Sequence, residues 1–259
     1  MSRRPMATVE LMLGPGGVQL NGPGGRVMTS GCAVTASSTA AEVEAVLAGL
    51  LPAVAEHAGT PPRGGWPARV VLDDSLCWLD VVQGDFASQS ERVLRALMQA
   101  SAAEVFGDTV AAQALRWQVQ ADGRHALLLA VPEVLVRTVE EALQRQHMAV
   151  ERIEPAFVRA WNQAAGHVEL RDGVVAWLHA GQAILVRMRR GSMSALGREP
   201  QDDSPGALNQ AMRRLLARHG DSVDEHTRRL VLAAVPVNPR STPSWRVHRV
   251  ELMRQGVAA

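Results

Sequence analysis

Hydrophobic residues at the start of the chain form three short runs, and two segments rich in glycine and proline separate them. The runs cover residues 8–13, 18–20 and 26–34, and the separating segments read GPGG (14–17) and NGPGG (21–25). Short apolar runs joined by such turn segments are typical of adjacent antiparallel strands. The pattern therefore predicts that the chain opens with a β-meander.

Helical signals follow the meander. Ser38 or Thr39 is a suitable N-cap for a helix that runs to about residue 57, and Glu42 favours its first turn. Pro52 is expected to kink this helix or to end it early, since proline cannot donate the backbone hydrogen bond. Ser88 or Ser90 caps a second helix that is predicted to stop at residue 107, a glycine.

The middle of the chain alternates strand and helix patterns. Residues 69–73 and 76–82 are predicted to pair through a turn at 73–75, and residues 115–120 and 125–131 to pair through a turn at 122–123. A helix is expected to begin at Pro132, and another is expected after Pro155.

The pattern then begins again. Residues 168–170, 174–180 and 183–190 predict a second β-meander, followed by a loop at 197–206, an amphipathic helix at 207–219 and strands near 230–235 and 245–252. This repetition predicts an α/β protein built from two related halves. The first half would cover residues 1–165, with an inserted αβ subdomain at about 66–131, and the smaller second half would cover residues 166–259.

The amino-acid composition excludes some kinds of catalytic and phosphate-binding site. The chain has 259 residues, is 47% hydrophobic and carries a formal net charge of +1, which is ordinary for a globular protein. It contains no lysine, because all 27 basic residues are arginine, and no tyrosine. Schiff-base chemistry and a phosphate-binding lysine are therefore excluded.

The cysteines and the hydropathy of the sequence indicate the cellular compartment of the protein. Cys32 and Cys77 have neither metal-ligand spacing nor a disulfide framework, and we expect two buried free thiols in a reducing compartment. The first residues are too weakly apolar for a signal peptide, and the longest apolar stretch, 173–186, is too short to span a bilayer. The sequence predicts a soluble, cytoplasmic protein.

Other catalytic motifs are absent or better explained by turns. The GPGG segment lacks the lysine and the following helix of a phosphate-binding loop. The histidines show no metal-ligand spacing, and the segment around Ser194 lacks the pattern of a nucleophile elbow. The pair Asp73 and Asp74 lies in a predicted turn, where aspartate is favoured for backbone hydrogen bonding.

The order of the segments resembles a known family. The runs ARVVLDDSLCWLDVV, SQSERVLRALMQASAAEVFG, LRWQVQADGRHALLLAVPEVLVRTVEEAL and VERIEPAFVRAWNQ follow one another as in the actin-like, ribonuclease-H-type proteins PilM of the type IV pilus and GspL of type II secretion. The resemblance covers about residues 7–235. It implies a degenerate actin-like ATPase fold.

Active members of the actin-like class hold Mg-ATP with an Asp-x-Gly in each hairpin and a glycine pair near the end. The resemblance places Met12 at the first aspartate and Gln19 where lysine is often found. It places His179 at the second aspartate and Ala233-Ala234 at the glycine pair. Since carboxylates are needed to hold Mg²⁺, the resemblance implies a pseudo-ATPase without a cofactor or a metal.

Arginines are concentrated near the end of the chain. Residues 187–259 carry 13 arginines and 7 acidic residues, against 14 and 19 in residues 1–186. This excess indicates either a basic docking face or arginines that are solvated on the surface. The candidate residues of such a face are Arg187, Arg189, Arg190, Arg214 and Arg218. Nucleic acid is a poor fit as partner, since few aromatic residues accompany these arginines.

We thus expect a non-catalytic scaffold of an inner-membrane assembly platform. The resemblance implies two partners, the cytoplasmic segment of a bitopic membrane protein and a hexameric motor ATPase, and places the chain at the membrane only through its partners. Two alternatives stay open: an active actin-like ATPase with displaced ligands, and a regulatory module that binds an acidic partner through the C-terminal arginines.

Overall fold

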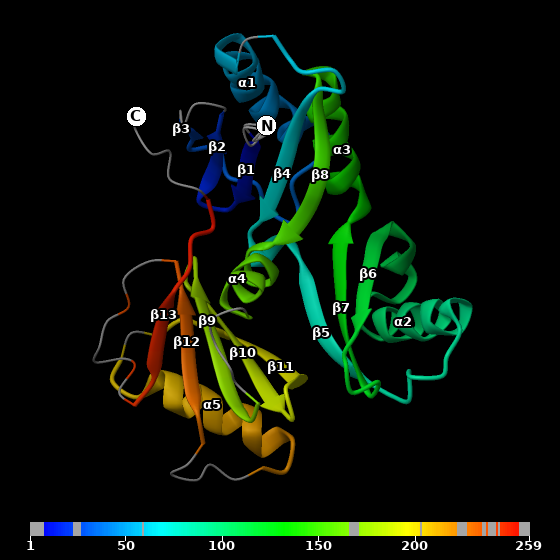
Figure 1. Cartoon of the computed structure of the whole chain (residues 1–259), viewed down its shortest axis with the longest axis vertical. Coiled ribbons are helices and arrows are strands. Elements are labelled where there is room, and N and C mark those ends of the chain that lie inside the picture. The colour runs from blue at the N-terminus through cyan, green and yellow to red at the C-terminus, as the bar shows by residue number, and fades with distance from the viewer. Residues whose placement is uncertain are drawn as a thin grey trace, which may run out of the picture.

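The computed structural model describes residues 8–22, 27–58, 60–165, 171–202, 204–221, 227–234, 237, 242 and 244–253. Its strands form two five-stranded sheets and one three-stranded sheet (Figure 1). The two larger sheets have the same plan, with orders β3-β2-β1-β4-β8 and β11-β10-β9-β12-β13. The prediction of two related halves, each opening with a β-meander, is confirmed at this level.

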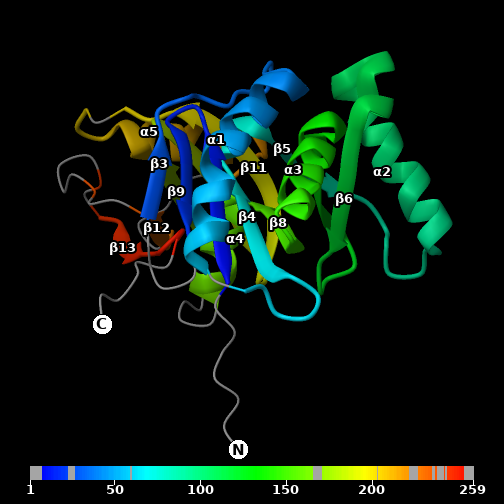
Figure 2. The ribbon, with the colours of Figure 1, turned by 90° about the horizontal axis from the view of Figure 1, so that it is seen from above.

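The first half contains the first large sheet and two helices. Its elements are β1 (Val9–Gly14), β2 (Gly17–Asn21), β3 (Val27–Ser30), α1 (Ala40–Ala58), β4 (Trp66–Leu72), α3 (Glu133–Arg145) and β8 (Met148–Pro155). The first three strands are antiparallel, and β4 and β8 run parallel to β1. Figure 2 shows α1 and α3 side by side over this sheet, where they bury one apolar core.

The second half repeats the pattern. It contains β9 (Gly173–His179), β10 (Gln182–Arg189), β11 (Ser192–Pro200), α5 (Ala207–Arg218), β12 (Arg229–Ala233) and β13 (Arg246–Arg249). The second meander is therefore shifted from the prediction. Its third strand is β11, part of which was expected to be a loop, while the predicted strand 168–170 lies outside the described residues.

A small subdomain is inserted between β4 and α3. It consists of β5 (Trp78–Gln83), α2 (Glu91–Phe106), the 3-10 helix η2 (Gly107–Ala112), β6 (Gln113–Val119) and β7 (His125–Pro132), with strand order β5-β7-β6. The predicted pairing of residues 69–73 with 76–82 is wrong, because β4 lies between β1 and β8 in the first sheet. The subdomain thus begins at β5 and not near residue 66. A short 3-10 helix, η1 (Asp74–Leu76), separates the two strands.

Local signals explain where the helices begin. The Thr39 amide donates to Glu42 Oε2 at 2.7 Å, and the Glu42 amide donates to Thr39 Oγ1 at 3.3 Å, which is a reciprocal capping box. At the start of α2, Ser90 Oγ accepts from the Val93 amide at 3.4 Å. The expected early end of α1 at Pro52 is wrong, since Leu47 and Leu51 anchor the helix in the core and it continues to Ala58.

The two halves meet at α4 (Ala156–Ala165), which follows β8 directly. The parallel strands of both sheets point toward this helix, so their carboxyl ends face one another in the middle of the molecule (Figure 1). A second apolar core, formed by α4, the inner face of the second sheet and residues of β5, fills this middle layer. Helix α5 covers the outer face of the second sheet, and α2 covers one face of the three-stranded sheet.

The two cysteines differ in their exposure. Cys77 is buried, and burial raises the pKa of its thiol. Cys32 is exposed beyond the end of β3, so the expectation of two buried thiols is wrong for this residue.

Within the described ranges, no helix is both long enough and apolar enough to cross a membrane.

Candidate functional site at the junction of the two halves

The carboxyl ends of parallel strands are the usual place for a ligand in α/β proteins. In this chain two hairpins border that place. The β1–β2 hairpin turns after Gly14, and the β9–β10 hairpin turns at Ala180 and Gly181, which both have positive φ. The segment between β4 and β5 passes between these hairpins and brings two adjacent aspartates there.

Asp73 connects the two hairpins. Its amide donates to the Leu13 carbonyl at 2.7 Å, and its Oδ1 accepts from the amide and the hydroxyl of Ser75 at 2.9 and 2.6 Å. Its Oδ2 lies 3.3 Å from His179 Nε2 in the other half, an ion-pair contact without hydrogen-bond alignment. Burial acts to raise the pKa of Asp73, but the His179 contact and the Ser75 hydrogen bonds outweigh it and lower the pKa.

Asp74 connects four segments at once. Its Oδ1 accepts from the Phe157 amide at 2.9 Å in the first turn of α4, and its Oδ2 accepts from Trp177 Nε1 on β9 at 2.7 Å. Its carbonyl accepts from Arg198 Nη1 on β11 at 2.8 Å. The Asp74 side chain is buried, and burial raises its pKa although both hydrogen bonds act to lower it. Both oxygens of this carboxyl group are thus engaged by the protein itself.

Gly14 lies against the side chain of Asp73. A Cβ atom added there would lie 2.7 Å from the Cβ of Asp73, whereas one added at Gly16 would meet nothing within 4 Å. The space that a small residue leaves in this hairpin is therefore taken up by the side chain of Asp73.

The residues that the resemblance placed at the ATP positions lie around this junction. Met12 and Gln19 face each other across the β1–β2 pair, and Met12 packs against the core between the halves. His179 ends β9 and stacks on Trp177 with ring centroids 5.4 Å apart. Ala233 is buried at the end of β12 and accepts from the Val250 amide at 3.1 Å, and the half-buried Ala234 follows it.

The chemistry open to this arrangement is limited. Each carboxylate oxygen of Asp73 and Asp74 already has a protein partner, so a metal ion that used these oxygens as ligands would compete with those contacts. Over the described part of the chain, no group of three or more His, Cys, Asp or Glu side chains is arranged to hold a metal ion. The junction is built as a polar contact between the halves.

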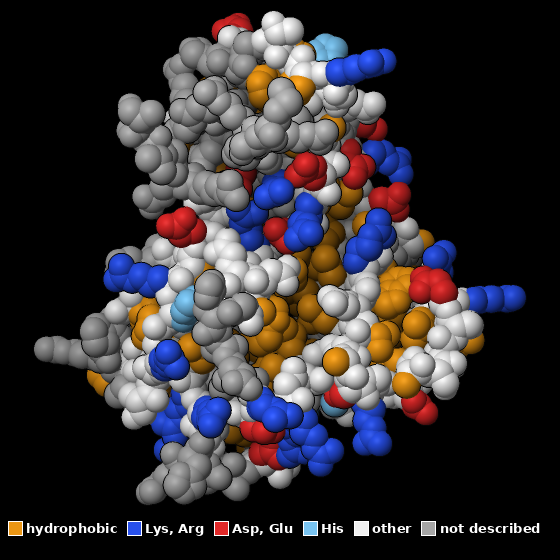
Figure 3. Space-filling model, viewed as in Figure 1, with side chains coloured by type: hydrophobic (Ala, Val, Ile, Leu, Met, Phe, Trp, Pro, Cys, Tyr) orange, Lys and Arg blue, Asp and Glu red, His pale blue; other side chains and the backbone are white. Residues whose placement is uncertain are grey.

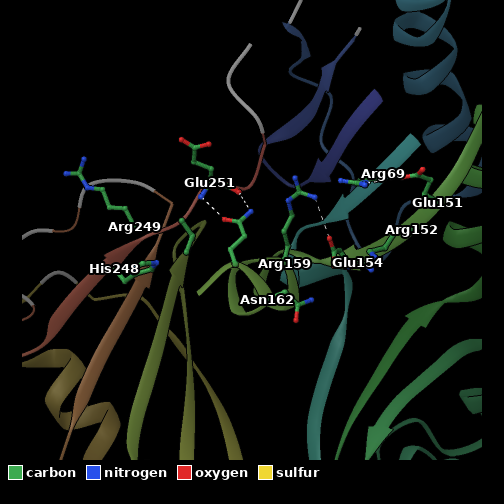
Figure 4. A pocket seen from close by; sticks show the side chains of 11 residues that line it. Arg69, Glu151, Arg152, Glu154, Arg159, Asn162, His248, Arg249 and Glu251 are labelled. Carbon is green, nitrogen blue, oxygen red and sulfur yellow. Dashed lines mark hydrogen bonds and ion pairs between the residues drawn. The ribbon is translucent and has the colours of Figure 1, made fainter. Parts of the chain in front are cut away.

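A charged cavity of about 850 Å³ lies on one side of the junction (Figure 4). Arg159 of α4 is buried beneath it, where its Nη2 donates to Glu10 Oε1 at 2.7 Å and its Nη1 lies 3.5 Å from Glu154 Oε1. Gln163, one turn further along α4, makes two hydrogen bonds with the backbone of Glu251, at 2.5 and 3.0 Å. This cavity balances four arginines with three glutamates, so it offers no single sign of charge to a ligand. Its charged lining residues are Arg69, Arg152, Arg159, Arg249, Glu151, Glu154 and Glu251.

The candidate basic face is divided into ion pairs. Arg187 and Arg189 both contact Asp221, and Arg187 is buried. Arg214 and Arg218 lie 3.1 and 3.8 Å from the carboxylate of Glu199. Arg190 is exposed at the turn after β10, and its amide donates to Asp172 Oδ1. Four of the five predicted partner-binding arginines therefore have an internal counter-ion.

Sequence reasoning missed the main residues of the junction. Asp73 and Asp74 were assigned to a simple turn, and Trp177 and Arg198 were not singled out. One signal was present: a tryptophan inside a fully apolar strand needs an acceptor for its indole N–H, and two aspartates follow another buried strand. Their pairing across more than 100 residues could not be read from local pattern.

Comparison with known proteins identifies the fold. No protein-family model and no curated protein matches the sequence. Among solved structures, a PilM-PilN type IV pilus biogenesis complex matches with TM-score 0.61 and 14% identity, over 89% of this chain and 81% of that one. A Bacteroides thetaiotaomicron protein with an actin-like ATPase fold matches with TM-score 0.59 and 6% identity, over 94% and 91%.

A third solved structure is the cytoplasmic domain of EpsL, an inner-membrane component of the type II secretion system of Vibrio cholerae. It matches with TM-score 0.53 and 11% identity, over 94% of this chain and 89% of that one. The chain therefore has the actin-like fold, as the sequence predicted, and PilM and an EpsL domain are among the structures that it resembles.

Proposed function

We propose that this actin-like chain is a non-catalytic scaffold in an inner-membrane assembly platform of the type IV pilus or type II secretion kind. It would dock the cytoplasmic segment of a bitopic membrane protein. In this role the chain works in the cytoplasm and reaches the membrane through its partner. A second contact, with the hexameric motor ATPase, belongs to the same proposal.

One observation carries the non-catalytic part. The place where the two hairpins would grip a nucleotide is occupied by side chains of the chain itself, since Asp73 contacts His179 and Asp74 binds Trp177. Opening that place would leave the buried indole N–H and the Phe157 amide without acceptors, and each such group costs about 1–3 kcal/mol. Met12 adds an apolar side chain where a metal-holding carboxylate would be required.

The docking part is supported by the fold and by the surface. The similar PilM structure was solved as a complex with PilN. In Figure 3, orange apolar side chains floor a hollow between the second half and the inserted subdomain. Exposed apolar surface of this kind is often a site of contact with another protein.

Calorimetry with Mg-ATP tests the non-catalytic part. We expect no binding heat with the full chain, and the same null result after EDTA treatment. Micromolar binding that EDTA abolishes would contradict the proposal and would favour an active ATPase with displaced ligands.

Affinity purification tests the docking part. The tagged full chain, mixed with detergent-solubilised membranes of its source at low salt, is expected to enrich a bitopic inner-membrane protein with a short cytoplasmic segment. A tagged chain with Asp74→Ala serves as the comparison for misfolding. Recovery of no platform protein by the wild-type chain contradicts the scaffold role.

A further inference from the structure

The outer strand of the inserted subdomain has an unpaired edge. Among the residues that the structure describes, strand β6 pairs with β7 alone, and the Gln120 amide donates to the His125 carbonyl at 2.8 Å at the end of this ladder. Hydrogen-bonded pairs alternate along an antiparallel ladder. With Gln120 directed toward β7, the N–H and C=O groups of Leu115 and Trp117 are directed away from it, toward the open edge.

One residue partly covers this edge. Arg116 Nη1 donates to the carbonyl of Leu115 at 2.9 Å, so the guanidinium of an exposed arginine occupies one of the outward-facing acceptors. An edge arginine of this kind discourages pairing with an arbitrary strand. It also places a positive charge where an acidic side chain of a pairing strand could replace the carbonyl as its partner.

A groove runs beside the same edge. It has a volume of about 860 Å³ and lies between β6, η2 and α2. Six apolar residues line it, together with two arginines, two glutamines and one glutamate. The residues that matter for binding are Ala100, Ala103, Val110 and Trp117 on the walls and Arg95 and Glu91 at the rim. Trp117 is only half-buried, and a tryptophan in a partly open groove is the kind of side chain that anchors an interface.

Helix α2, beside this groove, exposes apolar side chains to solvent. Helix α2 buries Met98 and Ala102, while Val93 and Leu97 on its other side are 41% and 43% exposed. Residues 93, 96, 97 and 100 share one helical face, and all four are valine, alanine or leucine. A surface helix normally turns polar residues outward. Figure 3 shows orange side chains exposed over the inserted subdomain, with charged side chains around them.

We propose that this surface docks an extended segment of another protein, in which apolar residues alternate with at least one acidic residue. The segment adds a strand to the Leu115–Trp117 edge of β6, its apolar side chains enter the groove, and its carboxylate pairs with Arg116. Backbone pairing supplies affinity and the groove supplies selectivity, as in other strand-addition complexes. Charge favours this occupant, because Arg95 is paired with Glu91 at 3.5 Å, whereas Arg116 donates to a neutral carbonyl and keeps its charge available to a carboxylate.

A second copy of this chain is a poorer occupant. A two-fold axis that pairs the centres of two β6 strands places Arg116 opposite Arg116 of the second copy, and like charges directly opposite on paired strands are destabilising. The proposal does not depend on the scaffold function, since the surface lies on the far side of the inserted subdomain from the junction (Figure 1). Failure of one leaves the other standing.

A peptide selection tests the proposal. A phage library of random peptides, each of about ten residues to match a strand, is selected on the immobilised full chain, and the most enriched peptide is synthesised. We expect the enriched sequences to alternate apolar residues and to contain Asp or Glu. Arg116→Glu should weaken the peptide by roughly tenfold or more, and bound peptide should slow amide hydrogen exchange at Leu115 and Trp117.

Two variants serve as matched controls. Val134→Ser changes a valine that is 51% exposed on α3, and Arg190→Glu reverses a charge in the second half. Neither should alter peptide affinity. The proposal is overturned if selection yields no binder, if the binders lack acidic residues, or if the exchange at β6 is unchanged. A dimer in light scattering that Arg116→Glu dissociates would assign the edge to a second copy and overturn it as well.

Discussion

At the junction of the two halves, the two carboxylate oxygens of Asp74 accept hydrogen bonds from the buried Phe157 amide and the buried Trp177 indole N–H. At the outer face of the inserted subdomain, by contrast, the backbone groups of Leu115 and Trp117 face outward, and apolar side chains of α2 lie in solvent. The polar groups at the junction bind one another and connect the two halves, whereas the backbone and apolar groups of the outer face are directed to solvent.

The junction and the outer face both resemble binding sites, but binding would have a different cost at each. A ligand at the junction would have to displace internal hydrogen bonds and leave buried groups unsatisfied. A partner at the outer face would have to displace only water and one exposed guanidinium. The comparison therefore predicts large stability losses for changes at the junction and almost none for changes at the outer face.

The largest effect is expected for Asp74→Ala. It leaves the Phe157 amide and the Trp177 indole N–H buried without acceptors, which should lower the free energy of unfolding by about 2–5 kcal/mol. Urea titration followed by circular dichroism measures this loss. Asp74→Asn is the control, since its amide oxygen keeps one acceptor and should lose less. A loss below about 1 kcal/mol for the alanine variant would show that the junction is not held by this residue.

A second test compares two glycines of the same hairpin. In Gly14→Ala the new methyl group lies 2.7 Å from Asp73 Cβ, and this overlap should cost about 1–3 kcal/mol. In Gly16→Ala the methyl group meets nothing within 4 Å and should cost much less. Equal costs in thermal or urea unfolding would mean that Asp73 does not fill the hairpin as described.

These residues also show what sequence reasoning could reach. Helix starts at Thr39 and Ser90 were predicted because a cap and its helix lie within a few residues. The pairing of β4 was not, since two apolar runs joined by a turn resemble a hairpin, whereas β4 is a parallel strand buried in another sheet. Its partners lie more than 50 residues away, beyond any local pattern.

The junction was unpredictable for the same reason. Asp74 and Trp177 are 103 positions apart, and each looked ordinary in its own segment. The arginine-rich second half was read as a candidate basic face because net charge counts residues without their partners. Asp221 and Glu199, which pair with four of those arginines, approach them only in the folded chain.

The next effect concerns the contact between the inserted subdomain and the second half. The Gln120 side chain donates to the Met193 carbonyl at 2.7 Å and accepts from the Met193 amide at 2.6 Å. Gln120→Ala should cost about 1–2 kcal/mol and speed hydrogen exchange at the Met193 amide. Gln163→Ala, which removes a similar but exposed pair of hydrogen bonds to Glu251, should cost less. Unchanged exchange at Met193 in the Gln120 variant would argue against this contact.

A smaller effect should depend on pH. The pKa of Asp73 is lower in the folded chain than its ordinary value of 3.8, so the unfolded chain binds more protons and stability rises with pH in this range. The contribution of Asp73 is complete about one pH unit above 3.8, near pH 5, and is lost as the pH falls through the lower pKa of the folded chain. The stability difference between wild type and Asp73→Asn should therefore shrink from pH 5 to pH 3. A difference that grows in urea titrations over this range would contradict the assigned direction.

The smallest effect is expected for Leu97→Gln on the outer face. Leu97 is 43% exposed and points away from the helix side that buries Met98, so polar replacement should change the free energy of unfolding by less than about 0.5 kcal/mol. Leu128→Ala on β7 is the matched contrast, since Leu128 is fully buried beneath the same helix and should lose about 2–5 kcal/mol. If Leu97→Gln proved strongly destabilising, its side chain would belong to the core of the subdomain. A neutral result would show that the fold does not need the half-exposed side chain of Leu97, as expected for a surface that contacts a partner.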